Sequence, residues 1–253
     1  MTLPIRLINK YIIFPFFVII FTSCIPMYYN PIKQNVNVFE KKGDIVATAN
    51  IQPLFAQLGI EAAYAINDNI GISSNYNRYN ITRLGGETNP FVKDFMWDNE
   101  LIFYKNFKFG LFGAANFGYG RGGFNVGNPY FRLSMDRLYS QPSVGFLLFN
   151  RFGFAFSTRF SQSFYHIKIY PEGYSDSEIK LIQSYFGLNN IDKPVFFIEP
   201  AFTLIWKDNT GSCKLQFVHS KSNRFNYGFN TENIILSIGI NINYFLNRGK
   251  YMH

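Results

Sequence analysis

The chain has 253 residues and a formal net charge of +8; aromatic residues make up 19% of it, whereas charged residues make up only 16%. A soluble domain carries about 25% charged residues, and the mean hydropathy of −0.03 is too low for a chain built from membrane-spanning helices. Lys and Arg are scattered along the chain rather than gathered in one stripe, so the positive charge does not indicate nucleic-acid binding. The composition favours strands that have one apolar and one polar face.

The N-terminus is predicted to be an export signal. Arg6 and Lys10 precede an apolar run over residues 11–21 that only Pro15 interrupts. This run is shorter than the roughly 20 residues that cross a bilayer as a helix, and its length fits the apolar region of a signal peptide. We therefore predict a signal peptide over residues 1–23. A secretory signal cleaved elsewhere and an anchor that is never removed are the two alternatives.

The residues that end the apolar run, Phe21-Thr22-Ser23-Cys24, resemble the lipobox of bacterial lipoproteins. In that family a signal peptidase cleaves before the cysteine, whose thiol carries diacylglycerol. Leu usually stands at the position that Phe21 occupies in this chain. The resemblance implies that Cys24 is the acylated N-terminus of the mature chain. A disulfide between Cys24 and Cys213 is possible in principle, but two cysteines indicate no disulfide framework.

Residues 24–43 are predicted to be a lipidated tether in the periplasm. Pro26, Pro31 and several Asn interrupt this stretch, and no clean period is visible before it ends in Lys41-Lys42-Gly43. Breaker residues without periodicity are typical of a linker rather than of a strand or helix.

From residue 44 onward the hydrophobic period is two. In the run 152–161, for example, four Phe alternate with small, polar or charged residues. A period of two indicates strands with an apolar face and a polar face. We predict about ten strands, with eight as the alternative because the faces of 69–79 and 108–122 are mixed. The predicted ranges are 44–52, 57–66, 69–79, 97–106, 108–122, 131–148, 152–168, 195–206, 212–220 and 232–246.

The links between these strands alternate in length. Short links at 67–69, 105–108, 150–151 and 207–211 are interleaved with longer ones at 80–96, 123–130, 169–194 and 221–230. The first link, at 53–56, is the exception, because it is short where a long one would be expected. Outer-membrane barrels have short periplasmic turns and long external loops, whereas a soluble sandwich with so apolar an outer face would aggregate. We predict an all-β fold: a closed, antiparallel, up-and-down transmembrane β-barrel over residues 44–246, followed by a tail over 247–253.

Taken whole, the chain resembles lipobox-bearing outer-membrane β-barrel proteins of Gram-negative bacteria, a group without an established molecular activity. The resemblance depends on Cys24 and on three strand signatures, FGYGRG at 117–122, SQPSVGF at 140–146 and FIEPAF at 197–202. It implies a location in the cell outer membrane, with the lipid anchor in the periplasmic leaflet. The chain departs from such barrels at its end, because eight residues follow Phe245, where an aromatic residue often comes last.

Motifs for catalysis or cofactor binding are not found. The sequence contains no HExxH, CxxC or GxxxxGK[ST] motif, and its three His are far apart. The glycines at 118, 120, 122 and 123 superficially resemble a dinucleotide loop, but nothing helical follows, so close packing in a strand is the better interpretation. We predict no metal site, no cofactor and no enzymatic activity. A hydrolase embedded in the barrel, with Asp and His at the rim, is a less favoured alternative.

Five charged residues are predicted to face the lumen, because each falls on the polar face of its strand. Charges inside a barrel must pair or stay hydrated, and ten strands leave only a narrow lumen. We predict that these residues form a network that largely closes it; a narrow pore for small solutes is the alternative. The predicted lumen residues are Glu61, Glu100, Arg159, Glu199 and Lys214.

The predicted function is a structural or surface-interaction role, with outer-membrane lipid and an unknown surface partner as the contacts. The external loops 80–96 and 169–194 would meet that partner. Their neighbourhoods carry side chains suited to protein or glycan contact, although Tyr at a membrane interface is an equally good explanation. These residues are Tyr76, Tyr79, Arg83, Tyr170, Tyr174 and Tyr185.

Overall fold

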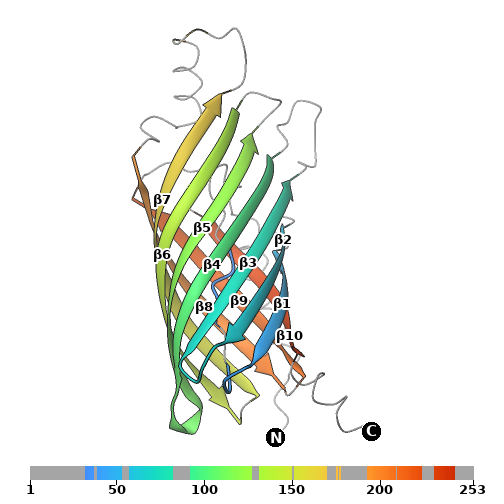
Figure 1. The fold of residues 1–253 in the computed structure, drawn as a ribbon. Helices are drawn as coiled ribbons and strands as arrows, with labels where there is room; N and C mark the ends of the chain where they lie inside the picture. The colour runs from blue at the N-terminus through green and yellow to red at the C-terminus, as the bar shows by residue number, and fades with distance from the viewer. Residues whose placement is uncertain are drawn as a thin grey trace, which may run out of the picture.

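The computed structural model describes residues 32–36, 39–52, 57–81, 92–126, 131–149, 151–169, 175, 177, 193–208, 210–223 and 231–242. Within these ranges ten antiparallel strands follow one another around a closed barrel, and β1 pairs with β10 to complete it (Figure 1). The predicted closed up-and-down barrel of ten strands is therefore confirmed. The strands are β1 (Ile45–Gln52), β2 (Gln57–Ala65), β3 (Ile70–Ile81), β4 (Val92–Asn106), β5 (Leu111–Val126), β6 (Phe131–Leu148), β7 (Phe152–Ile169), β8 (Val195–Lys207), β9 (Gly211–Ser222) and β10 (Thr231–Asn241).

Strands β4 and β5 extend farther than predicted at the end of the barrel that carries the long links. The ladder between β4 and β5 continues to the pair Lys93 and Asn125, beyond the predicted limits of 97 and 122. The predicted loops 80–96 and 123–130 shrink accordingly to 82–91 and 127–130. Side-chain alternation did not reveal this extension, because consecutive apolar residues, Phe95 and Met96, fall on both faces of the strand there.

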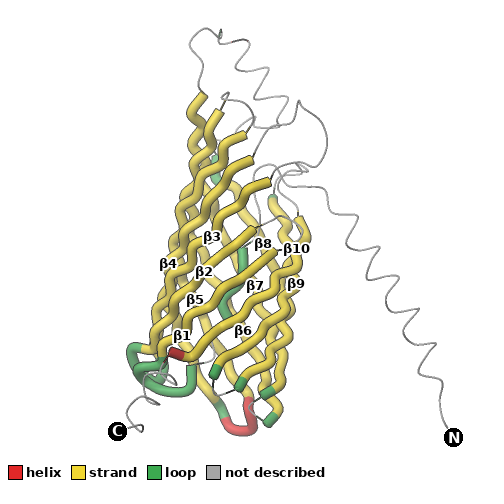
Figure 2. The backbone as a smooth tube through the Cα atoms, turned by 90° about the vertical axis from the view of Figure 1, so that its right-hand side faces the viewer, coloured by secondary structure: helices red, strands yellow, loops and turns green. Residues whose placement is uncertain are grey.

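The other end of the barrel is formed by four tight turns at 66–69, 107–110, 149–151 and 208–210. We call it the short-turn end, and the opposite end, where the strands join through 53–56, 82–91, 127–130, 170–194 and 223–230, the long-link end (Figure 2). At the 107–110 turn the chain was predicted to start a strand at 108, but Lys108–Gly110 form one turn of 3-10 helix. Gly110 has a φ of +81°, and a Cβ there would lie 2.1 Å from the carbonyl oxygen of Leu147, so glycine is required.

The barrel wall has the reverse polarity of a soluble protein. On β8, Phe196 is 48% exposed, whereas Phe197 and Glu199, on the opposite face of the strand, are buried in the lumen. Among the described residues the same alternation runs around the wall and leaves a belt of large apolar side chains on the outside, among them Trp97 and Trp206. So large an apolar surface is stable only in lipid, and closure of the sheet pairs the backbone groups that lipid could not hydrate.

Helices contribute little to the described parts of the chain. None of the helices in those parts is long and apolar enough to cross a membrane.

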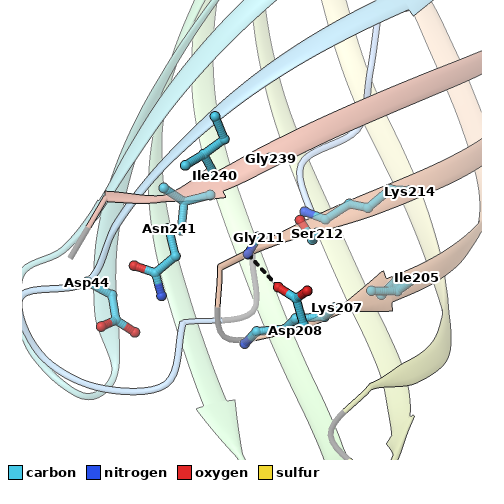
Figure 3. Close-up of a pocket in the computed structure, with 11 residues that line it drawn as sticks. Asp44, Ile205, Lys207, Asp208, Gly211, Ser212, Lys214, Gly239, Ile240 and Asn241 are labelled. Atoms are coloured by element: carbon cyan, nitrogen blue, oxygen red, sulfur yellow. Dashed lines mark hydrogen bonds between the residues drawn. The ribbon is translucent and has the colours of Figure 1, made fainter. Parts of the chain in front are cut away.

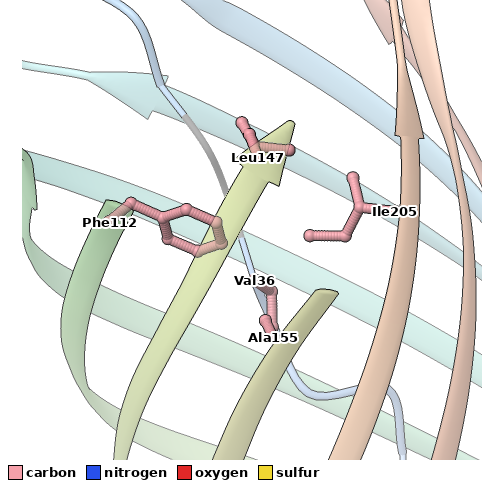
Figure 4. Packing of buried hydrophobic residues seen from close by; sticks show 5 residues of the cluster. All are labelled: Val36, Phe112, Leu147, Ala155 and Ile205. Carbon is pink, nitrogen blue, oxygen red and sulfur yellow. The ribbon is translucent and has the colours of Figure 1, made fainter. Parts of the chain in front are cut away.

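Two apolar clusters fill the lumen near the short-turn end. Val36 packs with Phe112, Leu147, Ala155 and Ile205, which come from four strands (Figure 4). Phe39 packs on the wall formed by β2 and β4, where its ring centroid lies 5.0 Å from that of Tyr104. Both clusters are built on residues that precede β1, so residues 32–36 and Phe39 belong to the barrel interior.

Candidate functional site: the lumen and the segment inside it

Residues Ile32–Val36 run in extended form through the middle of the barrel (Figure 2), and we call them the lumen segment. All five side chains are buried, with at most 2% exposed. The predicted tether of residues 24–43 did not anticipate this position, because we placed the whole stretch outside the barrel. The physical reason is that Lys33, Gln34 and Asn35 complement the polar lumen, and complementarity of this kind leaves no periodic pattern in the sequence.

Gln34 is held by β7, β8 and β9 together. Its backbone N–H donates to Gln216 Oε1 at 2.8 Å, and Gln216 Nε2 donates back to the Gln34 carbonyl oxygen at 3.1 Å. The Gln34 side chain donates to the carbonyl oxygen of Glu199 at 2.5 Å and accepts from the hydroxyl of Ser157 at 2.7 Å. Backbone and side chain are thus both satisfied, as buried polar groups must be.

Asn35 makes the corresponding contacts with β3 to β6. Its side-chain amide donates to Glu100 Oε2 at 2.8 Å and to Ser73 Oγ at 3.2 Å. Its carbonyl oxygen accepts from Gln141 Nε2 at 2.8 Å and from Asn116 Nδ2 at 3.2 Å. With Gln34, it connects the lumen segment to strands on opposite sides of the barrel.

Charged side chains complete the attachment of the lumen segment. The Lys33 ammonium pairs with the Glu61 carboxylate on β2, and both are buried. Lys214 Nζ donates to the carbonyl oxygen of Val36 at 2.8 Å, and Arg159 Nη2 donates to that of Lys33 at 3.2 Å. Lys214 and Arg159 therefore hold the backbone of this extended peptide, and Glu61 holds its Lys33 side chain.

The five predicted lumen residues all face inward, and all are buried. The structure brings the Arg159 guanidinium to 3.9 Å from the Glu100 carboxylate. Arg159 also lies directly opposite Glu199 in the register of β7 and β8. Glu61 and Lys214 instead reach the lumen segment. The contacts among the five therefore run largely through residues 33–36, which the sequence predicts to be part of a tether outside the barrel.

A second buried ion pair was missed from the sequence. Arg137 Nη2 and Nε donate to Asp98 Oδ2 and Oδ1 at 2.7 and 3.1 Å, and both side chains are at most 1% exposed. The Tyr139 ring lies between Arg137 and Arg159, with guanidinium carbons 5.0 and 4.7 Å from its centroid. Strand parity already placed Asp98 and Arg137 on the polar face, so the signal was present, but it did not indicate that they pair across two intervening ladders.

Glycines of β5 make room for this pair. A Cβ on Gly120 would lie 1.9 Å from Asp98 Oδ1, and one on Gly118 would lie 2.2 Å from the Tyr139 ring. The glycines at 118 and 120 therefore allow close side-chain packing within a strand, which was the preferred interpretation of this stretch.

The short-turn mouth holds a small cavity, of about 30 Å³, between β8, β9 and β10 (Figure 3). That volume has room for about two water molecules. At its edge Asp208 Oδ1 accepts from the Thr210 hydroxyl and from the N–H groups of Thr210 and Gly211. These hydrogen bonds, that of the hydroxyl first, lower the pKa of the Asp208 carboxyl from its ordinary value.

The remaining candidate groups lie outside the lumen or outside the described residues. His166 Nε2 lies 3.6 Å from Asp136 Oδ2, but this pair is on the outward face of the barrel, and the His166 side chain is 63% exposed. Cys213 is a free, half-buried thiol. Within the described ranges no three His, Cys, Asp or Glu side chains are grouped as metal ligands would be. Cys24, Arg83, Tyr170, Tyr174 and Tyr185 lie outside those ranges, as does the side chain of Tyr79.

These features define a membrane-spanning β-barrel with an extended peptide of its own chain in the lumen. No family model and no curated protein sequence matches the chain. Three solved structures illustrate the likeness in fold. The N-terminal β-barrel domain of Pseudomonas aeruginosa OprF is 7% identical, with a TM-score of 0.34, over 80% of this chain and 99% of that one.

The β domain of the Bordetella autotransporter BrkA is 10% identical, with a TM-score of 0.42, over 79% of this chain and 99% of that one. An outer-membrane channel from Pseudomonas putida F1 is 7% identical, with a TM-score of 0.39, over 83% and 98%. At such identities and scores the likeness concerns the barrel fold, and we take no functional argument from it.

Proposed function

We propose that this protein is a lipid-anchored outer-membrane barrel whose lumen is closed by its own N-terminal segment, with a structural or surface-interaction role. The observation that carries this proposal is the attachment of residues 33–36 to side chains or carbonyls of β2 through β9. A solute would have to displace a peptide whose Gln34 and Asn35 side-chain N–H groups, Lys33 ammonium and backbone carbonyls of residues 33–36 are hydrogen-bonded to the wall. Each buried group left unpaired costs about 1–3 kcal/mol.

Planar-bilayer conductance tests the closed lumen. We expect wild-type protein to be silent and a variant in which Lys33-Gln34-Asn35 is replaced by Gly-Gly-Gly to conduct, because the wall would keep its charges but lose their peptide partners. The matched control is Lys41→Ala with Lys42→Ala, which changes residues exposed at the short-turn mouth. Steady conductance of the wild type would contradict the proposal and favour a narrow pore for small solutes.

The lipid anchor of the proposal is a diacylglycerol on Cys24. The support is the lipobox-like ending Phe21-Thr22-Ser23-Cys24 after an apolar run. Intact-mass measurement of wild-type protein and Cys24→Ser tests it: the wild type should carry the mass of the acyl groups. Masses that differ only by the substituted atom would refute the anchor without affecting the argument for the lumen.

The surface-interaction role is assigned to the long-link end, through 82–91 and 169–194. Tyr76, on β3 near that end, is exposed on the outer face and suits either a partner or the membrane interface. Removal of residues 172–190 should abolish binding of a surface partner while leaving heat-modifiable migration of the barrel unchanged. Loss of that migration would instead show that the link is needed for folding.

A further inference from the structure

We propose that the chain, traced backward from Phe39, crosses the barrel from the short-turn end to the long-link end. The acylated Cys24 would then be at the cell surface, with its lipid in the outer leaflet. The inference rests on the acylation proposed above. It replaces the periplasmic leaflet expected from the sequence with the opposite one, and it follows from the direction of the lumen segment and from the length of chain before it.

The direction of the segment can be followed against the strands. Phe39 packs on Ala65 and Tyr104, next to the short turns, and Asn106 Nδ2 donates to its carbonyl oxygen at 2.7 Å. Val36 contacts residues near the same end, such as Phe112 at the start of β5.

Preceding residues lie progressively farther from that end. Asn35 reaches Asn116, five positions into β5, and the Lys33 carbonyl oxygen accepts from Arg159, seven positions into β7. Going from Phe39 back to Lys33, the chain therefore ascends from the short-turn mouth into the middle of the lumen, and Ile32 continues from there.

A return to the short-turn mouth would use most of the chain between Cys24 and Ile32. A strand inclined at about 40° rises roughly 2.5 Å per residue along the barrel axis, so Arg159 lies about 18 Å above the short-turn mouth. Residues 24–31 number eight and span at most about 29 Å when fully extended. A chain that reversed at Ile32 would need a turn, the 18 Å descent and a passage around the wall, through a lumen that residues 33–36 and Phe39 already fill.

The path from Ile32 to the long-link rim is short along the wall formed by β1 and β2. Glu61, which pairs with Lys33, is only four positions from Gln57, the first residue of β2, so the rim there is about 10 Å above it. Outward side chains of this wall, Ile51 and Leu58, remain apolar almost to the rim. A lipid on Cys24 can therefore pass over the low rim between β1 and β2 and enter the adjacent leaflet.

The wall below this rim carries unused hydrogen-bonding groups. Asn50, Gln57 and Asn77 face the lumen and are at least 97% buried. Both polar side-chain atoms of Asn50 and Gln57, and Oδ1 of Asn77, have no hydrogen-bond partner among the described residues. Buried amides are rarely left in that state, and a peptide that continues upward from Ile32 would supply the partners, as Gln34 and Asn35 do lower down.

Site-directed labelling of intact cells tests the threading. In a Cys213→Ser background, Asn30→Cys should react with a membrane-impermeant maleimide on intact cells, while Lys41→Cys, at the short-turn mouth, should react only after lysis. Heat-modifiable migration shows that each variant has folded. Protection of Asn30→Cys until lysis, or labelling of Lys41→Cys in intact cells, would overturn the proposal.

Acylation is measured separately, on the same cells, by the mass difference between wild type and Cys24→Ser. Labelled Asn30→Cys with an acylated wild type supports a lipid in the outer leaflet. Labelled Asn30→Cys without acylation refutes the anchor and leaves the threading intact, so the two failures are distinguishable.

Discussion

The buried pair between Asp98 and Arg137 offers the sharpest test of the energetics of the lumen. Arg137→Met leaves the Asp98 carboxylate without its bidentate partner, and Asp98→Asn leaves the guanidinium uncompensated; each guanidinium–carboxylate contact is at most 3.1 Å long and inaccessible to solvent. Removal of one partner of a buried pair costs about 3–5 kcal/mol, whereas replacing both with neutral groups of similar volume costs little more than the packing.

We therefore expect each single variant to lower the free energy of unfolding by about 3–5 kcal/mol and the double variant to lose no more than the worse single one. The coupling energy of the cycle should then be about 3 kcal/mol or more. Denaturant unfolding in detergent micelles measures it through the fluorescence of Trp97 and Trp206, both of which face the lipid.

The matched control is the pair between Arg121 and Asp136 on the outer wall. Its Nε and Oδ1 atoms are 3.8 Å apart, and the Arg121 side chain is 66% exposed. Arg121 is ten positions into β5, about 25 Å from the short-turn mouth and so at the hydrated edge of the membrane. Screening there reduces such a pair to about 0.2–1 kcal/mol, so Arg121→Ala should change stability little. The claim that a dry ion pair stabilises the lumen would be refuted by a coupling energy near zero for Asp98 and Arg137. It would also be refuted if the single variants lost no more free energy of unfolding than Arg121→Ala.

Three further outcomes are expected. Arg159→Ala removes donors to the Lys33 carbonyl and to Gln141, so it should lower the melting temperature and let ions through, whereas Lys41→Ala should do neither; differential scanning and bilayer conductance measure the two effects. Asp208→Asn should destabilise the barrel at neutral pH. Because the folded-state pKa of Asp208 is depressed, the advantage of the wild type is present above the ordinary value of 3.8 and is lost as the pH falls through the lowered one; unfolding midpoints measured against pH would contradict this if the gap were constant. A labelling reagent or protease added to whole cells should reach Tyr174 in the 169–194 link, and protection until lysis would reverse the orientation of the barrel.

The sequence alone supplied the barrel because its evidence is local. A strand shows its two faces within a few residues, so the parity of Glu61, Glu100, Arg159, Glu199 and Lys214 could be assigned without knowing any neighbour, and each of them faces inward. The turns were similarly visible, since Asn67 and Asp208 accept backbone N–H groups two or three residues onward.

Closure of the sheet, by contrast, determines which of these residues meet. Asn35 contacts Gln141, and Gln34 contacts Gln216, across separations of 106 and 182 residues. Such contacts depend on strand register, tilt and the width of the lumen, none of which a side-chain alternation records. The lumen segment illustrates this most clearly: Lys33-Gln34-Asn35 has no period and could equally belong to a hydrated linker. Only inside a closed barrel do its amides and ammonium meet partners from β2 through β9 at once, and the barrel is closed because β1 pairs with β10.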